Sequence, residues 1–128
     1  MKFLFDSHLL VWIGYFPNQV APRARAIIAS DDAVILFSAA SLWELTIKQA
    51  LKRPDFDVDV SGLRHGLLRN HFHEISIEGD HAIAVADLPP IHRDPFDRLL
   101  VAQAKAEGAT FVTADKQLAE YGDWVMIV

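Results

Sequence analysis

The stretch from Asp94 to Asp115, DPFDRLLVAQAKAEGATFVTAD, holds one complete helix-to-strand unit and decides the fold class. Asp94 is a typical cap residue, Pro95 suits a first helical position, and Gly108 is the residue type that ends helices. Between them, apolar residues recur at helical spacing, at Phe96, Leu99, Leu100 and Ala104. We therefore expect a helix that begins at Pro95 and closes at Gly108, followed by a strand over Thr110–Thr113.

The same alternation extends outward to both ends of the chain. Four further short runs are apolar and rich in β-branched or aromatic residues, which is typical of strands: Lys2–Phe5, Val34–Phe37, Ile75–Ile77 and Trp124–Val128. Helical spacing lies between them, as in Leu9, Trp12 and Ile13 or in Leu42, Leu45 and Leu51. Alternation of this kind gives βαβ units with right-handed crossovers. The sequence thus predicts an α/β fold with a mainly parallel central sheet of about five strands, helices on both faces and the last strand at an edge.

The length of 128 residues lies in the range of one compact domain, so we expect a single domain over residues 1–128. Lys52–Asp55 is predicted to be a turn, and Asp57–Gly62 is the least regular part of the middle. No repeat, linker or low-complexity tract divides the chain.

Composition restricts the chemistry. The sequence has no cysteine, which excludes disulfides, thiolate nucleophiles and zinc–thiolate sites. A net charge of −5 argues against a protein that coats nucleic acid non-specifically, because non-specific binding to phosphates comes from Lys and Arg. Asp6 interrupts the N-terminal apolar run after three residues, and no other run approaches the roughly 20 apolar residues of a membrane span. We expect a cytoplasmic protein with no membrane association.

Four acids lie where a ligand site is expected. In an open parallel sheet that site lies beyond the carboxyl ends of the strands. Asp6 ends the first strand, Glu44 lies one to two turns into the helix after the second, Asp97 opens the helix before the fourth, and Asp115 follows the fourth. Oxygen-only clusters suit Mg²⁺ or Mn²⁺, which activate water for attack on a phosphodiester and neutralise the charge that develops there. The pattern indicates a metal-dependent nuclease.

Each of these acids also has an interpretation as a helix cap. Asp6 or Ser7 can cap the first helix, and Asp115 can cap a short helix through Tyr121. Glu44 fits this interpretation least well, because Ser38 already begins its helix and places Glu44 in the second turn. The conjunction of four acids, rather than any one of them, favours the site.

The chain resembles the PIN-domain endoribonucleases, in particular the VapC-like toxins of toxin–antitoxin pairs. The resemblance runs nearly end to end and rests on four blocks: Phe3–His8 with Leu10–Trp12, Ser38–Leu45, Leu88–Ala104 and Val112–Asp115. Position by position it implies that Asp6, Glu44 and Asp97 are metal-binding catalytic acids and that Asp115 is a fourth. Many relatives have Thr at the position of Ser7, and either hydroxyl can hydrogen-bond an acid. Thr113 is expected either to orient Asp115 or simply to finish its strand.

The resemblance also implies partners: an RNA substrate, a small antitoxin that blocks the acidic cleft, and a second copy of the chain in a homodimer. Two other classes have parallel sheets with acids at the carboxyl edge, namely receiver domains and haloacid-dehalogenase-type phosphatases. Ser7 and His8 stand where these classes would require further acids after the first strand. The stronger alternative is a binding module of the same fold without turnover, because fold does not fix function.

Several polar and aromatic residues are left outside the predicted site. The histidines, among them His71 and His73, lack metal-ligand spacing and are expected at the surface or as caps. His8 and His92 lie near the acids in sequence, with no geometry to assign them a role. Arg98, Lys48 and Lys52 are interpreted as solvated charges, and Trp12 and Trp43 as packing residues.

Overall fold

A computed structural model describes all 128 residues. Five strands form one sheet in the order β3-β2-β1-β4-β5, and every neighbouring pair is parallel. The strands are β1 (Lys2–Phe5), β2 (Val34–Ser38), β3 (His73–Ile75), β4 (Thr110–Thr113) and β5 (Val125–Ile127). The predicted parallel sheet of five strands is confirmed, and β5 lies at an edge as expected.

The helices are α1 (Ser7–Tyr15), α2 (Pro22–Ala29), α3 (Ala39–Ala50), α4 (Val60–Arg69), α5 (Gly79–Ala84) and α6 (Pro95–Ala106), with the 3₁₀ helices η1 (Pro17–Gln19), η2 (Val85–Asp87) and η3 (Lys116–Tyr121). The expected α6 is confirmed at both ends: the Asp94 carboxylate accepts the N–H groups of Phe96 and Asp97, and Gly108 has a φ of 64° just beyond the helix. None of the helices combines the length and the apolar character needed to cross a bilayer.

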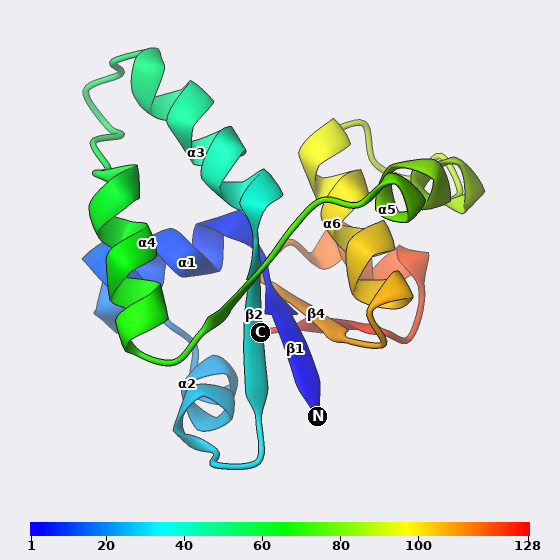
Figure 1. Cartoon of the computed structure of the whole chain (residues 1–128), viewed down its shortest axis with the longest axis horizontal. Coiled ribbons are helices and arrows are strands. Elements are labelled where there is room, and N and C mark those ends of the chain that lie inside the picture. The colour runs from blue at the N-terminus through cyan, green and yellow to red at the C-terminus, as the bar shows by residue number, and fades with distance from the viewer.

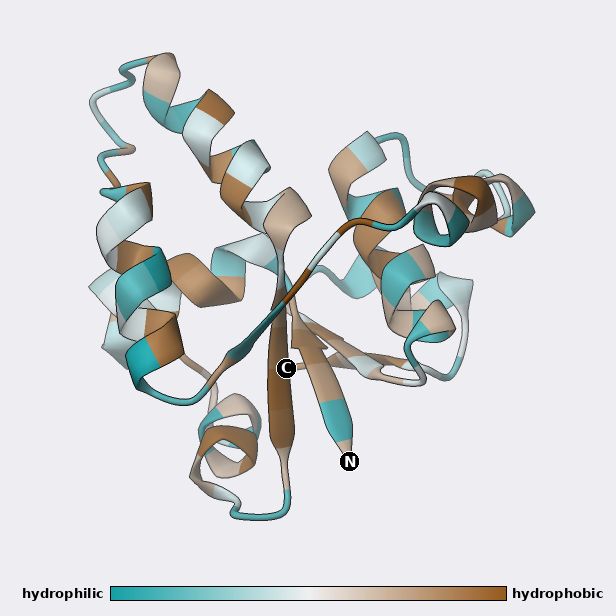
Figure 2. Ribbon diagram, viewed as in Figure 1, coloured by the Kyte–Doolittle hydropathy of each residue, from teal (hydrophilic) through white to brown (hydrophobic).

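Side chains of alternate strand residues point to opposite faces of the sheet, and helices cover both faces. On β1, Phe3 and Phe5 belong to a core shared with α1 and α4, whereas Leu4 belongs to a core shared with α6 and η3. Figure 1 shows α1, α3 and α4 on one side of the strands and α5 and α6 on the other. The strands are the most uniformly hydrophobic part of the centre (Figure 2). The prediction of helices on both faces is confirmed.

Two expectations for the middle of the chain are wrong. The third strand is His73–Ile75 rather than Ile75–Ile77, because Ile75 already pairs with the last residue of β2, Ser38. Residues 57–62 are not irregular throughout: the Asp59 carboxylate accepts the Gly62 N–H at 3.0 Å and caps α4, which begins at Val60. Strand β3 lies at the edge of the sheet and is largely exposed, so its sequence has little of the apolar pattern that predicts a strand.

Candidate metal centre

Asp6 occupies the carboxyl end of the central strand β1 and is 3% exposed. Its Oδ1 accepts the Leu9 N–H at 3.1 Å and thereby caps α1, which decides between the two predicted caps, Asp6 and Ser7. Its Oδ2 accepts a hydrogen bond of 2.5 Å from the Thr113 hydroxyl, at the end of β4. Burial is the largest effect on this carboxyl and raises its pKa. Asp6 is therefore both a helix cap and a fixed acid of the sheet edge.

Glu44 is not a cap, as expected, because the Ser38 hydroxyl accepts the Ala40 N–H and caps α3 one turn earlier. The Glu44 side chain is nonetheless buried at 4% exposure. Its Oε1 accepts a hydrogen bond of 2.6 Å from the Ser7 hydroxyl, and its Oε2 lies 3.2 Å from Lys48 Nζ. The resemblance implied that the Ser7 hydroxyl could hydrogen-bond an acid, and in the structure that acid is Glu44. Lys48 is an ion-pair partner of the site rather than the solvated charge we expected.

Asp97 lies in the first turn of α6 and faces the other acids. Burial and then the negative charges of Asp94, Asp6, Glu44 and Asp115 raise the pKa of this carboxyl from 3.8 to about 7. Asp94 satisfies the N–H groups at the start of α6, so the Asp97 carboxylate is free of a capping role. The structure therefore brings Asp6, Glu44 and Asp115 close enough to Asp97 to oppose its negative charge.

Asp115 forms the outer rim of the cluster, with 42% of its side chain exposed. Its Oδ1 accepts the Gln117 N–H at 3.1 Å and caps η3, as the cap interpretation predicted. The Thr113 hydroxyl oxygen accepts the Asp115 N–H at 3.1 Å while donating to Asp6. Thr113 therefore orients the segment that carries Asp115 and links it to Asp6.

His92, which the sequence left outside the site, lies beside two of its acids. Its Nε2 is 3.3 Å from Asp115 Oδ2 and 3.8 Å from Asp97 Oδ2. One potential ligand atom from each of His92, Asp97 and Asp115 lies within 4.8 Å of the others. The nearness of His92 to Asp94 and Asp97 in sequence was the only signal available, and it did not reveal which way the loop turns.

Of the remaining predictions for polar residues, those for three histidines are confirmed and the one for Arg98 is wrong. His71 and His73 are exposed, and His81 is buried with its Nδ1 accepting the Glu78 N–H in a capping box, so surface and capping roles are confirmed for these three. Arg98 is not a free charge: its guanidinium donates to the carbonyls of Pro89 and Val85 and to the Tyr121 hydroxyl.

Trp43 is not a packing residue of the core. It is 59% exposed and meets Phe96 edge-on, with ring centroids 5.2 Å apart. Trp43 directly precedes Glu44 and Phe96 directly precedes Asp97, so the pair joins α3 to α6 beside the acids. Helical spacing alone could not separate this position from the buried face of α3.

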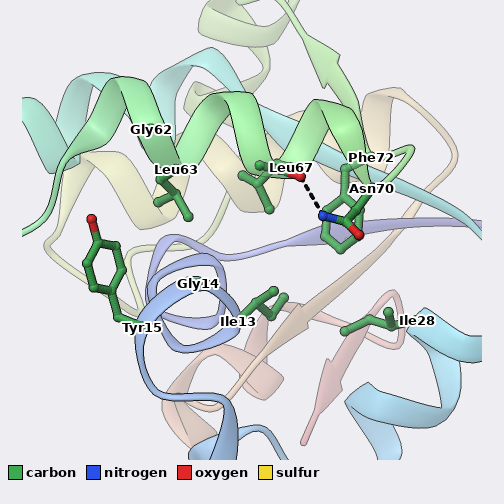
Figure 3. A pocket seen from close by; sticks show the side chains of 10 residues that line it. Ile13, Gly14, Tyr15, Ile28, Gly62, Leu63, Leu67, Asn70 and Phe72 are labelled. Atoms are coloured by element: carbon green, nitrogen blue, oxygen red, sulfur yellow. Dashed lines mark hydrogen bonds between the residues drawn. The ribbon is translucent and has the colours of Figure 1, made fainter.

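A hollow of about 630 Å³ lies away from the acids, between α1 and α4 (Figure 3). Its walls are mainly apolar and include Ile13, Tyr15, Leu63 and Leu67. None of the four predicted acids lines it.

The raised pKa of Asp97 predicts how the stability of the metal-free protein depends on pH. Because the folded-state pKa of Asp97 is about 7 and its ordinary value is 3.8, the folded protein binds more protons than the unfolded chain between these values. The free energy of unfolding should therefore fall as pH rises through this window, by on the order of 2 kcal/mol after allowance for solvent screening. Urea unfolding with a chelator at about pH 5 and about pH 8 measures the change.

Other groups titrate over the same range, so the control is the same pair of measurements on Asp97→Asn. The fall with pH should be smaller in this variant by the contribution of Asp97. Added Mg²⁺ should stabilise the wild type more at about pH 8 than at about pH 5, because protons compete with the ion for the carboxylates. An equal fall with pH in both proteins would contradict the assigned environment of Asp97.

A family model described as "PIN domain" matches residues 3–123 of the chain. The chain is similar in structure to VapBC2 from Rickettsia felis bound to a DNA fragment from its promoter, with a TM-score of 0.73, 16% identity, and coverage of 100% of this chain and 98% of that one. It is also similar to VapBC-1 from nontypeable Haemophilus influenzae, with a TM-score of 0.61, 14% identity, and coverage of 97% and 98%.

A third similar structure is Mycobacterium tuberculosis VapC20, described as a toxin that cleaves the sarcin–ricin loop, with a TM-score of 0.64, 13% identity, and coverage of 94% and 96%. No curated protein sequence matches the chain significantly. The family match spans nearly the whole chain. This chain therefore belongs to the PIN-domain family.

Proposed function

We propose that this chain is a metal-dependent endoribonuclease and the toxin of a toxin–antitoxin pair. The observation that carries the proposal is the convergence of Asp6, Glu44, Asp97 and Asp115 from four separate segments. Burial first, and then the charges of Asp94 and the other three acids, raise the pKa of Asp97 to about 7. Packing carboxylates together in this way is unfavourable in the free protein. A bound divalent cation would convert that repulsion into attraction.

The donor set fits Mg²⁺ or Mn²⁺. Asp6, Glu44, Asp97 and Asp115 offer carboxylate oxygens only, which are the ligands that these hard cations prefer. Such an ion, when bound, supplies an activated water and neutralises charge that develops on a phosphodiester. One ion or two would satisfy the same acids.

The protein supplies orientation. The Asp6 carboxylate is held by the Leu9 N–H and the Thr113 hydroxyl, and both bonds fix it at the end of β1. Glu44 is held by the Ser7 hydroxyl and by Lys48. Preset ligands of this kind lose little freedom when an ion binds, and a defined ion position aligns the phosphate for attack.

RNA is the proposed substrate, and a small antitoxin that blocks the acidic cleft is the proposed partner. Support comes from proteins of the same fold: a structure from Klebsiella pneumoniae is named as a toxin–antitoxin complex, and VapC20 is named as a toxin that cleaves the sarcin–ricin loop. The net charge of −5 makes bare binding of a polyanion unfavourable, so bound cations would be needed for RNA to approach the acids. We further propose that the protein acts in the cytoplasm and forms a homodimer.

The test is incubation of purified, antitoxin-free protein with total cellular RNA and Mg²⁺ or Mn²⁺, followed by sequencing of new RNA ends. Discrete ends that disappear with a chelator and with Asp6→Asn support the proposal and identify the target. A folded, metal-supplied wild type that produces no new ends supports the alternative, a PIN-fold binding module without turnover. Exposed Asp31 lies in the turn before β2, so Asp31→Asn is the matched charge control and should leave the ends unchanged.

A further inference from the structure

The His92 ring lies against the rim of the acidic cluster, where its Nε2 is 3.3 Å from Asp115 Oδ2 and 3.8 Å from Asp97 Oδ2. The ring is largely buried, with 18% of the side chain exposed. One ligand atom each from His92, Asp97 and Asp115 lies within 4.8 Å of the others, a spacing that suits direct metal ligation by His92. The hydrogen bonds of the ring point to a different role.

The second ring nitrogen is already engaged. His92 Nδ1 lies 3.1 Å from the backbone nitrogen of Asp94 and accepts its N–H. A nitrogen that accepts a hydrogen bond carries no proton, so the ring proton resides on Nε2. Nε2 therefore carries the ring N–H, lies within ion-pair distance of the two carboxylates and has no lone pair for an ion.

The position of the ring is fixed by the two elements that carry its acids. The backbone N–H of His92 donates to the Tyr121 hydroxyl at 3.0 Å, at the end of η3. Arg98, on α6, donates to the same hydroxyl at 3.2 Å and to the carbonyls of Pro89 and Val85 in the preceding segment. The segment before α6 is thus tied to both η3 and α6, whose first residues lie beside Asp115 and Asp97.

We propose that His92 is a positioning residue whose Nε2–H holds the Asp115 carboxylate toward Asp97, rather than a metal ligand. The inference rests on the proposed metal-dependent function and adds a residue to its site. The Gln117 N–H already donates to Asp115 Oδ1, and in the proposed arrangement the His92 Nε2–H, 3.3 Å away, restrains Oδ2. Each oxygen keeps a lone pair for an ion. The inner site stays oxygen-only, which favours Mg²⁺ and Mn²⁺ over ions that prefer imidazole.

Asp94 gains a second role from this arrangement. Its carboxylate caps α6 through the N–H groups of Phe96 and Asp97. Its own backbone N–H donates to His92 Nδ1 and so fixes the ring tautomer with the proton on Nε2. One residue therefore orients Asp97 through the helix and Asp115 through the histidine. A backbone donor cannot be removed by a side-chain substitution, so the test must act on His92 itself.

The first measurement is the ring tautomer in the metal-free wild type, from long-range proton–nitrogen NMR correlations of the histidine rings, with His92→Gln assigning the His92 signals. We expect the Nε2–H form for His92. The Nδ1–H form would overturn the proposal directly, because Nε2 would then be free to bind an ion. This readout depends on neither metal binding nor cleavage.

The second measurement is Mn²⁺ affinity by calorimetry for wild type, His92→Ala, His92→Gln and the exposed control His65→Gln. Loss of a residue that orients a metal ligand costs about 10–100-fold in affinity, so we expect a loss of about 10-fold for His92→Ala. The Gln amide N–H can replace the Nε2–H donor, so His92→Gln should recover most of the affinity, and His65→Gln should match wild type.

Two outcomes would overturn the inference about His92 alone while wild type still binds Mn²⁺ and cleaves RNA. One is unchanged Mn²⁺ affinity in a folded His92→Ala protein. The other is a failure of His92→Gln to recover affinity together with a much larger loss of Zn²⁺ than of Mn²⁺ binding, which would identify His92 as a ligand. A wild type that binds no Mn²⁺ would instead overturn the proposed function as well.

Discussion

Asp97→Asn is expected to keep the fold and to lower RNA cleavage by about 10³-fold or more, because loss of one anionic ligand removes several kcal/mol of transition-state stabilisation. Asn has nearly the volume of Asp, and the capping of α6 belongs to Asp94, so the helix should be unaffected. The Asn amide is uncharged, which makes it a far weaker ligand for a hard cation. Cleavage of a mapped RNA substrate measures the loss.

The same substitution should stabilise the metal-free protein near neutral pH and above. Asp97 has a pKa of about 7 because burial and four neighbouring acids oppose its charge. Above this pH the charged form therefore costs folding free energy, and the neutral amide removes the cost. A variant that is more stable but inactive would separate a role in chemistry from a role in folding. A folded Asp97→Asn protein with normal turnover would contradict the proposed mechanism.

Local chemistry was enough to predict most of the site. Asp6 and Asp115 follow strand ends, Asp97 opens a helix, and Glu44 lies in the second turn of the helix after β2. Parallel strands bring such positions to one edge whatever the details of packing. That rule placed Asp6 and Asp115 by their strands and Glu44 by the helix that follows β2. It also explains why α6 was predicted most accurately, since its cap, its apolar spacing and its final glycine all agree.

The features that sequence reasoning missed depend on tertiary contacts. Helix α4 buries only Leu63 and Leu67, so its apolar spacing is weak, and its cap, Asp59, lies in a run of alternating acids. The exposure of Trp43 follows from which face of α3 meets the sheet. The His92 backbone is held by the Tyr121 hydroxyl, and Arg98 donates to that hydroxyl and to the Pro89 carbonyl, contacts that the sequence does not reveal.

Asp6→Asn and Asp6→Ala are expected to differ in stability and to agree in activity. Asp6 has two roles, because Oδ1 caps α1 and Oδ2 belongs to the acidic cluster. Asn caps helices as well as Asp does, so Asp6→Asn should retain the bond to Leu9, whereas Ala loses a cap worth about 1 kcal/mol. In both variants the buried Thr113 hydroxyl loses its acceptor, because the Asn amide nitrogen that replaces Oδ2 is a donor, so this cost of about 1–3 kcal/mol is common to the two. We therefore expect Asp6→Ala to be less stable than Asp6→Asn by about 1 kcal/mol, the contribution of the cap, in urea unfolding.

Cleavage should instead fall by about 10³-fold in both variants, since both remove the same negative charge from the site. The comparison separates the two interpretations that the sequence left open for this residue. If Asp6 were only a cap, Asp6→Asn would cleave RNA like wild type, and Asp6→Ala would lose activity only as far as it unfolds. If Asp6 is a metal ligand, the well-folded Asn variant is inactive, and its inactivity cannot be attributed to loss of the helix. Far-ultraviolet circular dichroism at the assay temperature, measured beside the cleavage rates, decides between them.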